Sequence, residues 1–292
     1  MEIQYVKAFA GAEVEIPAPG AHAMVLVSIG AESSALPTRP DATVWVVLRG
    51  TVNVSCQQGE AILRSGEWIQ LEAEDCPVVR CGKRGLVVGV VMGHLLHARQ
   101  ANSLHGALLP GFGRADRGQL RALLRQWRLT MRGAPMQMPC LHPLTAAWQA
   151  KQLLQCMAGL QSPYEEFVGR CPGRSLRRRR LVFCRLQRAF IQQRFHLERS
   201  MPVTAMAERA CMSLSYFIRT CNVVYGNCPQ AMAKAMRLER AARLLRDSSL
   251  SIAEVGSQSG FQNNCSFSRV FRNCYGIPPS LYRKQGERHG HW

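Results

Sequence analysis

An internal duplication in the last third of the chain constrains its fold more than any other feature. The stretch VTAMAERACMSLSYFIRTCNVVYGNCP, residues 203–229, aligns with IAEVGSQSGFQNNCSFSRVFRNCYGIPP, residues 252–279, when the second copy has one extra residue. Each copy holds two helical patterns joined by a tight turn, at Cys211 in the first and Gly260 in the second. Equivalent residues of the two copies include Phe217 and Phe267, Arg219 and Arg269, and Tyr225 and Tyr275.

The second helix of each copy begins at a polar residue that suits a helix N-cap. This residue is Ser213 in the first copy and Asn263 or Asn264 in the second. Two helices joined by so short a turn form a helix-turn-helix, whose second helix enters the major groove of DNA. Between the copies lies PQAMAKAMRLERAARLLRDSS, a predicted linker helix with Pro229 in its first turn. The duplication therefore predicts two groove-binding helices on one linker.

The positive charge of the chain is concentrated in the same region. Residues 174–292 hold 21 Lys and Arg against 6 Asp and Glu, a balance of +15, whereas residues 1–100 hold 8 against 10, a balance of −2. Of the 21 cations, 19 are arginines, which suit forked contacts to phosphate and guanine. This asymmetry favours nucleic acid as a partner. A basic surface kept for solubility is the alternative, and a membrane is disfavoured because no basic helix also shows an unbroken apolar face.

The first hundred residues alternate short apolar runs with turn signals. Runs such as TVWVVLRG, TVNVSC and EWIQLEA are rich in β-branched residues, and glycines separate them. This pattern predicts an antiparallel sandwich or small barrel. The stretch RPDATVWVVLRGTVNVSCQQGEAILRSGEWIQL resembles the small barrel called a cupin. Such a barrel either holds a small ligand or is filled by its own side chains, and the sequence leaves both open.

Residues that could hold a metal are scarce in this predicted barrel. The only histidine between Met1 and Gly93 is His22, whereas metal-dependent cupins use two or three histidines and a carboxylate. We therefore expect no metal, no cofactor and no catalytic residue. His22 and Glu67 are expected to take surface or hydrogen-bonding roles.

The cysteines and the apolar runs indicate a cytoplasmic protein. The chain has 12 cysteines, scattered and without a CxxC pair, which favours reduced, buried thiols over disulfides or a metal site. The longest apolar stretch, LVVGVVM, is far shorter than the roughly 20 residues that span a bilayer. We expect no membrane partner.

A helical period begins at Arg117. In RGQLRALLRQWRLTM the apolar residues form one stripe with arginines opposite, and this stripe either docks on the chain's own barrel or forms a subunit interface. A second helical segment, PLTAAWQAKQLLQCMAGL, follows it. We place a domain boundary at GRCPGRS, before the run Arg177 to Arg180, which is either a solvated helix start or a phosphate contact. The helix after this run should turn the following residues inward: Leu181, Phe183, Leu186, Phe190, Ile191 and Phe195.

From about Leu181 to Lys284 the chain resembles the arabinose-regulator (AraC/XylS) family of transcription factors. The resemblance is carried by RLERAARLL, SIAEV, GF at 260 and 261, FSRVFR, YGIPP and YR at 282 and 283. Departures from the family pattern are Gly256, Cys221 and Cys228, which affect packing and capping. The resemblance implies a DNA-binding domain of two helix-turn-helix units bridged by a long helix, together with an N-terminal cupin-like sensor and dimerisation helices.

The polar face of each second helix is the predicted DNA-reading surface. In the second unit Phe267 and Phe271 should anchor the helix inward, so that four other side chains project outward. Asn can pair with adenine, Arg with guanine, and an apolar side chain can contact the thymine methyl group. The predicted DNA-binding residues are Ser215, Ile218, Arg219, Asn264, Cys265, Ser268 and Arg269. We expect the second unit to read polar base edges more strictly than the first.

These features together predict a sequence-specific, DNA-binding transcription regulator that is not an enzyme. The resemblance favours an activator, so the expected partners are an operator in double-stranded DNA, RNA polymerase, a second copy of the chain, and a small effector or protein at the N-terminal domain. Two other classes are a cupin-type enzyme fused to a DNA-binding domain and a DNA-repair methyltransferase with such a domain. The methyltransferase would need a reactive cysteine, and MPCLHP at 138–143 supplies no convincing context.

The predicted fold class is α+β, with three successive parts. An N-terminal antiparallel cupin-like β-barrel should be followed by an amphipathic helical connector and by an all-α domain with two helix-turn-helix units. The expected ranges are 1–98 for the barrel, 114–172 for the connector and 181–286 for the DNA-binding domain. Within the last range the first unit takes about residues 203–225, the linker helix about 229–247 and the second unit about 252–275.

Overall fold

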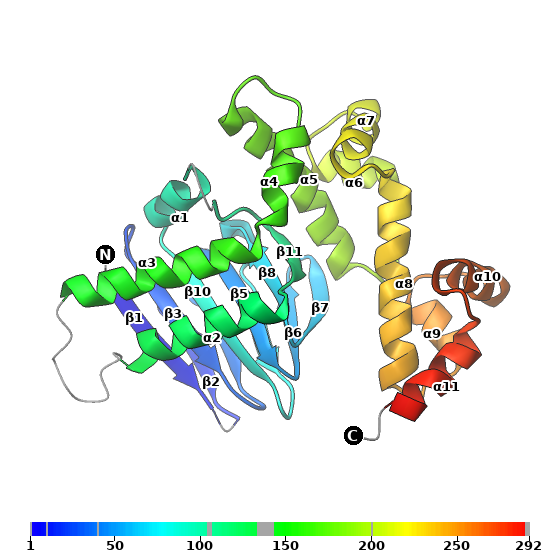
Figure 1. The fold of residues 1–292 in the computed structure, drawn as a ribbon, viewed down its shortest axis with the longest axis horizontal. Helices are drawn as coiled ribbons and strands as arrows, with labels where there is room; N and C mark the ends of the chain where they lie inside the picture. The colour runs from blue at the N-terminus through cyan, green and yellow to red at the C-terminus, as the bar shows by residue number, and fades with distance from the viewer. Residues whose placement is uncertain are drawn as a thin grey trace. The chain divides into compact units, whose positions relative to one another are not determined.

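The computed structural model describes residues 2–9, 11–39, 41–103, 107–132, 143–199 and 201–289. Contacts divide the chain into two compact units, Met1–Cys184 and Arg185–Trp292. The first unit combines two β-sheets with helices and the second is all helical, so the fold is of the predicted α+β class (Figure 1).

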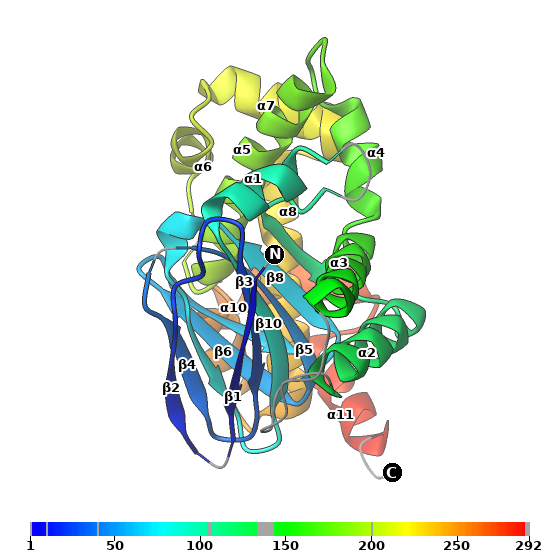
Figure 2. The ribbon, with the colours of Figure 1, turned by 90° about the vertical axis from the view of Figure 1, so that its left-hand side faces the viewer.

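The first unit holds two sheets that face each other (Figure 2). The six-stranded sheet has the order β1 (Ile3–Ala8), β3 (Met24–Ile29), β10 (Leu86–Met92), β5 (Ala42–Arg49), β8 (Glu67–Leu71) and β11 (Gly111–Arg114). The five-stranded sheet has the order β2 (Glu13–Ile16), β4 (Ser34–Pro37), β9 (Val78–Cys81), β6 (Thr51–Cys56) and β7 (Gly59–Arg64). A short 3-10 helix, Ala73–Asp75, follows β8.

The two sheets differ in how their faces are covered. All residues of β3 and β8 are buried, whereas buried and exposed residues alternate along β7. Helices lie on the outer face of the six-stranded sheet, which is therefore covered on both sides, and the five-stranded sheet turns its outer face to solvent (Figures 1 and 2). These helices are α2 (Arg117–Arg132) and α3 (Pro143–Leu160), whereas α1 (His94–Ala101) and α4 (Pro163–Arg170) lie at one end of the sheets.

The strand pairing is mixed, which corrects the expectation of a purely antiparallel fold. β1 pairs with β3 in parallel, and β2 pairs with β4 in parallel, while the other strand pairs are antiparallel. The reason is that the chain runs from the first sheet to the second twice in succession, as β1–β2 and then as β3–β4. The second passage lies beside the first in the same direction. Among the described residues, no strand joins the two sheets into one continuous barrel.

Side chains fill the space between the sheets around Trp45. Its indole is fully buried, and a Cβ atom added to Gly89 on the neighbouring strand β10 would lie 2.3 Å from the ring. Glycine at position 89 is therefore what makes room for the indole. Thr43, two residues along the same strand and on the same face, is also fully buried.

The apolar stripe of α2 packs inside its own unit. Leu123 and Trp127 are buried, and α2 contacts α3, while Arg121 and Arg125 on the opposite face are exposed. His22 is exposed, and Glu67 is buried with its Oε2 accepting a hydrogen bond from the Arg64 amide at 3.1 Å, so both take roles of the expected kind.

Helix α5 (Leu176–Phe195) carries the division between the units. Five of the six residues that should turn inward are buried, but the side chain of Leu181 is 50% exposed. At 100° per residue Leu181 lies about 200° around the helix from Phe183, on the opposite side. Within the described residues no helix combines the length and the hydropathy that a bilayer span requires.

The second unit places two pairs of helices along one long helix. The first pair is α6 (Val203–Arg209) and α7 (Leu214–Tyr225), the long helix is α8 (Pro229–Asp247), the second pair is α9 (Ile252–Gln258) and α10 (Asn264–Tyr275), and α11 (Pro279–His289) follows. α7 contacts α8, and α9 and α11 contact α8 as well. Figure 1 shows the two pairs near opposite ends of α8.

Candidate nucleic-acid interface

The first pair of helices is held by a cap and a small apolar core. Ser213 is the N-cap of α7, and its hydroxyl accepts a hydrogen bond from the Tyr216 amide at 3.4 Å. Phe217 and Cys221 are fully buried and face α6 and the rest of the unit. Cys221 thus takes a core position, so this departure from the family pattern bears on packing, as expected. The helix ends at Gly226, whose φ of 69° is left-handed.

Three predicted contact residues lie on the uncovered side of α7. Ser215 and Arg219 are exposed, and Ile218 is partly buried. The Arg219 guanidinium lies over the ring of Tyr216, with its carbon 5.6 Å from the ring centroid. This contact holds the arginine along the helix surface.

The second pair has a stronger cap and a larger aromatic core. Asn263 is the N-cap of α10, and its Oδ1 accepts hydrogen bonds from the amides of Cys265 at 2.8 Å and Ser266 at 3.3 Å. Phe267 and Phe271 are fully buried, as the sequence pattern predicted. Their ring centroids lie 5.6 Å apart in a T-shaped arrangement. These contacts determine which face of α10 remains uncovered.

The predicted contact residues of α10 lie on that uncovered face, except that the side chain of Asn264 lies close to α9. Cys265 and Arg269 are exposed and Ser268 is partly buried. Asn264 is exposed as well, but its Oδ1 lies only 3.3 Å from the position that a Cβ atom on Gly256 would take. The amide of Asn264 therefore lies close to α9 instead of pointing straight away from the helix pair.

The two turns use the same left-handed backbone with different residues. The turn of the second pair has Gly260 at φ 76°, and the turn of the first has Cys211 at φ 52°. A Cβ atom on Gly260 would lie 2.9 Å from the carbonyl oxygen of Leu197, so the second turn has no room for a side chain. Cys211 is exposed and adopts a conformation that costs an L-residue about 1–2 kcal/mol.

Arg237 of α8 holds the second turn from the side, a role that the sequence interpretation missed. Its Nη1 donates a hydrogen bond to the carbonyl oxygen of Gly260 at 3.0 Å, and its guanidinium carbon lies 5.1 Å from the centroid of the Phe261 ring. Burial lowers the pKa of this guanidinium from its ordinary value. A signal for this contact exists in the sequence, since Arg237 lies one helical turn before Ala241 on the packing side of α8.

The two reading helices carry no acidic side chain of their own, since neither α7 nor α10 contains an Asp or a Glu. Arg240 of the linker helix pairs with Glu198, which follows α5, at 3.2 Å, and Arg243 pairs with Glu239 of the same helix. The exposed faces of α7 and α10 therefore carry polar groups and arginines without a carboxylate of their own helix, as a surface for a polyanion requires.

The arginine run at the start of α5 is only partly free for a ligand. Arg177 and Arg178 are exposed, whereas Arg179 and Arg180 are partly buried. Arg180 donates from Nη1 to the carbonyl oxygen of Ala101 at 3.2 Å, and burial lowers its pKa. Half of the run thus contributes to packing within the first unit.

The structure adds little in support of a metal or a thiol chemistry. Within the described residues no three His, Cys, Asp or Glu side chains come together as a metal site would need. None of the eleven cysteines within the described residues forms a disulfide, and Cys211, Cys265 and Cys274 are exposed, which corrects the expectation that the thiols are buried. Cys211 lies in the turn between α6 and α7, and Cys265 and Cys274 lie on the uncovered part of α10. The stretch MPCLHP lies outside the described residues apart from the backbone of Pro143.

A protein-family model matches within this second unit. Residues 206–285 match the family model described as a helix-turn-helix domain. The transcriptional activator NphR of Rhodococcus sp is 37% identical over 106 residues, which cover 36% of this chain and 31% of that protein. The MmsAB operon regulatory protein of Pseudomonas aeruginosa is 31% identical over 97 residues, covering 32% of each. The match thus spans about a third of the length of these relatives.

Among solved structures, the DNA-binding domain of AdpA in complex with a target DNA is 29% identical, with a TM-score of 0.35. It covers 37% of this chain and 97% of the solved chain. A transcriptional regulator with an AraC-type DNA-binding domain from Chromobacterium violaceum is 27% identical, with a TM-score of 0.35, and covers 36% of this chain and 95% of the solved one.

Proposed function

From the AraC-type helix-turn-helix domain that residues 206–285 form, we propose that the chain is a sequence-specific, DNA-binding regulator of transcription. The observation that carries this proposal is the pair of acid-free, solvent-facing helices α7 and α10 on one linker helix. α8 has 19 residues and is therefore about 28 Å long. This length is close to the spacing of about 34 Å between successive major grooves on one face of the duplex.

Each reading helix has its own part in the recognition that we propose. On α10, Asn264 pairs with adenine and Arg269 with guanine, while Cys265 and Ser268 contact neighbouring base edges or the backbone. On α7, Ile218 contacts a thymine methyl group, and Ser215 and Arg219 add weaker polar contacts. The exposure of Ser215, Arg219, Asn264, Cys265 and Arg269 supports the assignment, and Ile218 and Ser268 are partly exposed beside them.

The remaining parts of the chain supply regulation in this proposal. Residues 1–98, which supply ten of the strands of the two sheets, serve in sensing or dimerisation, residues 114–172 connect them to the rest of the chain and contribute a homodimer interface, and residues 181–286 bind DNA. The exposed face of α2, with Leu129 and its arginines, supports the interface. The name of the relative NphR, a transcriptional activator, supports activation. In this proposal the chain acts on RNA polymerase and works in the cytoplasm. No enzymatic activity is part of the proposal.

The test is duplex binding by the full chain as a function of salt. If the second unit neutralises six or more phosphates, the slope of log affinity against log salt should be about −5 or steeper. Footprints on a selected operator should show two protected major-groove faces about 34 Å apart for each monomer. A slope near zero, or protection of one groove only, would contradict the proposal. Binding that does not distinguish a selected operator from random duplex would also contradict it.

A further inference from the structure

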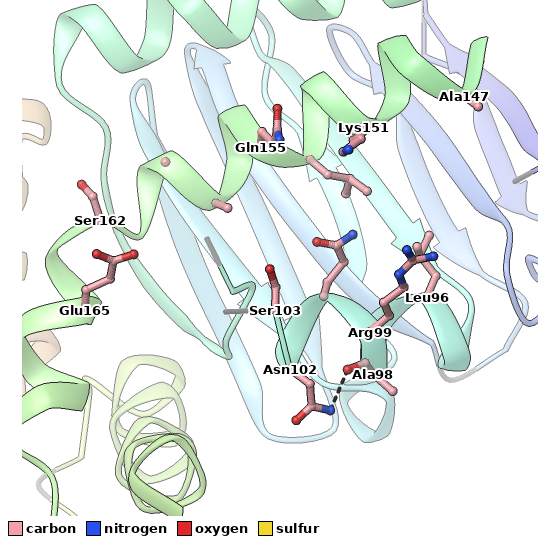
Figure 3. A pocket seen from close by; sticks show the side chains of 14 residues that line it. Leu96, Ala98, Arg99, Asn102, Ser103, Ala147, Lys151, Gln155, Ser162 and Glu165 are labelled. Carbon is pink, nitrogen blue, oxygen red and sulfur yellow. Dashed lines mark hydrogen bonds between the residues drawn. The ribbon is translucent and has the colours of Figure 1, made fainter. Parts of the chain in front are cut away.

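A groove on the first unit has the chemistry of a small-molecule site and takes no part in DNA reading. It lies between α1 and α3 and extends to the start of α4, and its volume is about 1050 Å³ (Figure 3). The residues from α3 and its end recur with the helical period, so that one face of this helix forms one wall. These residues are Ala147, Lys151, Leu154, Gln155, Ala158, Gly159 and Ser162.

The groove has an apolar floor. Leu96 of α1 and Leu154 and Ala158 of α3 line it and are buried, with exposed fractions of 7%, 3% and 6%. An apolar ligand body placed here would leave water and contact these three side chains.

The walls above this floor carry positive charge from both helices. Figure 3 shows the Arg99 guanidinium extending from α1 toward α3, on which Lys151 lies. Both side chains are exposed, and neither has a salt bridge within the described part of the chain. At the far end of the groove, Glu165 lies near enough to Arg180 to influence the pKa of that arginine. Glu165 thus has a cation near it, whereas Arg99 and Lys151 lie toward the other end of the groove.

The space between the two sheets does not offer an equivalent site beside Trp45. The buried indole and the close approach of Gly89 fill it, and the Trp45 Nε1 and Thr43 Oγ1 atoms there have no hydrogen-bond partner. A polar ligand head at this point would have to displace the indole. The groove outside the six-stranded sheet needs no such displacement.

We propose that this groove binds a small amphipathic anion, with the anionic group between Arg99 and Lys151 and the apolar body on Leu96, Leu154 and Ala158. The proposal deepens the regulatory role proposed above by assigning the effector site and its ligand class. Only the interpretation of the ligand as an effector of transcription rests on that role. Binding itself is a property of the first unit and can be measured without DNA.

The direct test uses 1-anilinonaphthalene-8-sulfonate, a fluorescent anion with an apolar body, titrated into the full chain. The dye should bind at one saturable site per chain, and octanoate should displace it, whereas octan-1-ol and acetate should not. The alcohol lacks the charge and acetate lacks the apolar body. Displacement by octan-1-ol as effective as that by octanoate would overturn the assignment of the anionic end.

Variants separate this site from general dye binding. The double variant Arg99→Glu with Lys151→Glu replaces attraction by repulsion and should weaken binding about tenfold or more. The variant Lys83→Glu, which reverses an exposed cation outside the groove, is the matched control and should leave the affinity within about twofold. Ala98→Trp places a large ring at an exposed lining position and should block the site without disturbing the core.

The outcomes distinguish the two proposals. Equal affinities for the double variant and Lys83→Glu, or no saturable site, would overturn the groove while leaving DNA binding unaffected. Saturable binding that depends on both cations supports the groove even where the salt-dependence test fails for DNA. A ligand-induced change in operator affinity that Ala98→Trp abolishes would join the site to regulation.

Discussion

The two helix-turn-helix units have the same helix lengths but different cores. The first helices, α6 and α9, have 7 residues each, and the second helices, α7 and α10, have 12 each. In the first helix-turn-helix unit, Phe217 contacts Phe190 of α5, with ring centroids 6.4 Å apart. In the second, Phe267 lies between Phe261 at 5.2 Å and Phe271 at 5.6 Å.

The difference shows that a duplicated backbone does not require duplicated contacts. The first unit completes its core with α5, through Phe190 and through the hydrogen bond from Gln187 Nε2 to the Tyr225 hydroxyl at 3.1 Å. The second helix-turn-helix unit completes its core with α8 and α11. The shared cluster includes Leu245 and, at its margin, Tyr282. Each reading helix is therefore sensitive to a different supporting helix, and substitutions at equivalent positions should have unequal effects.

The largest expected difference follows from removing the central phenylalanine of each unit. Phe267→Ala should cost about 3–5 kcal/mol, and Phe217→Ala should lie at or below the lower end of that range, because Phe217 has fewer aromatic neighbours. Hydrogen exchange of the full chain should show faster opening of α10 in the first variant and of α7 in the second. Phe→Leu at each position is the milder control. Equal acceleration of both helices in either variant would mean that the units open together.

The turns should respond with opposite signs. Gly260→Ala should destabilise the second unit by about 2 kcal/mol, because the new methyl group meets the Leu197 carbonyl and the left-handed backbone is unfavourable for alanine. Cys211→Gly should stabilise the first unit by up to about 1 kcal/mol, since it relieves the same backbone strain. Thermal unfolding and local hydrogen exchange measure both. A loss of stability in Cys211→Gly would show that the cysteine side chain contributes more than its backbone costs.

The reading arginines sharpen the comparison at the level of DNA. Arg269→Ala should cost about 1–3 kcal/mol at a selected operator and much less on random duplex, because a base contact is lost. Arg219→Ala should cost less, since this side chain lies over the Tyr216 ring and its unit has fewer polar groups for base edges. Arg177→Ala, which lies outside both helix-turn-helix units, is the control and should weaken binding to operator and random duplex alike. Equal losses for Arg269→Ala on operator and random DNA would mean that it contacts phosphate.

The smallest effect concerns the start of each first helix. In α9, Ser251 and Glu254 form a capping box, in which the Ser251 amide donates to Glu254 Oε2 at 2.7 Å. The hydrogen bonds from Ser251 hold the pKa of Glu254 below its ordinary value. The box therefore adds stability above the carboxyl's ordinary pKa, and this contribution is lost as the pH falls through the depressed pKa.

The residue of α6 that is equivalent to Glu254 is Ala205. The N-cap residue of α6, Pro202, offers no side-chain hydrogen bond. The amide resonances at the start of α9 should shift as the carboxyl titrates, while those of α6 should not. In Glu254→Gln the shift at α9 should disappear. A shift of equal size in α6 would assign the effect to a general change of charge.

Local sequence patterns predict those features that depend on neighbouring residues. The caps Ser213 and Asn263 and the buried anchors Phe267 and Phe271 follow from helical period and polar starts, and the structure confirms them. Their proposed contacts with bases remain predictions. The contact from Arg237 to Gly260 was not predicted, because it joins residues on different helices through a turn whose position tertiary packing determines.

The same limit applies to the unit that holds the two sheets, Met1–Cys184. Strand β11, Gly111–Arg114, has two glycines and no apolar alternation, so only its pairing with β8 makes it a strand. The parallel pairing of β1 with β3 depends on the path of the chain between sheets, which no local pattern encodes. Arg99 and Lys151 both line the groove, although they lie far apart in the sequence. The helical period of each segment does not predict that the two residues line the same groove.

The parallel strand pairs give the first sixteen residues a protective role. β1 is the outermost strand of one sheet and β2 is the outermost strand of the other, so this short segment covers an edge of each. Beneath it, β3 reads MVLVSI and has six buried residues, with backbone groups that β1 satisfies. Proteolysis before Met24 would uncover two unpaired edges at once, one of them strongly apolar. Such edges recruit strands from other molecules, so the shortened protein should aggregate even where every remaining residue can still fold.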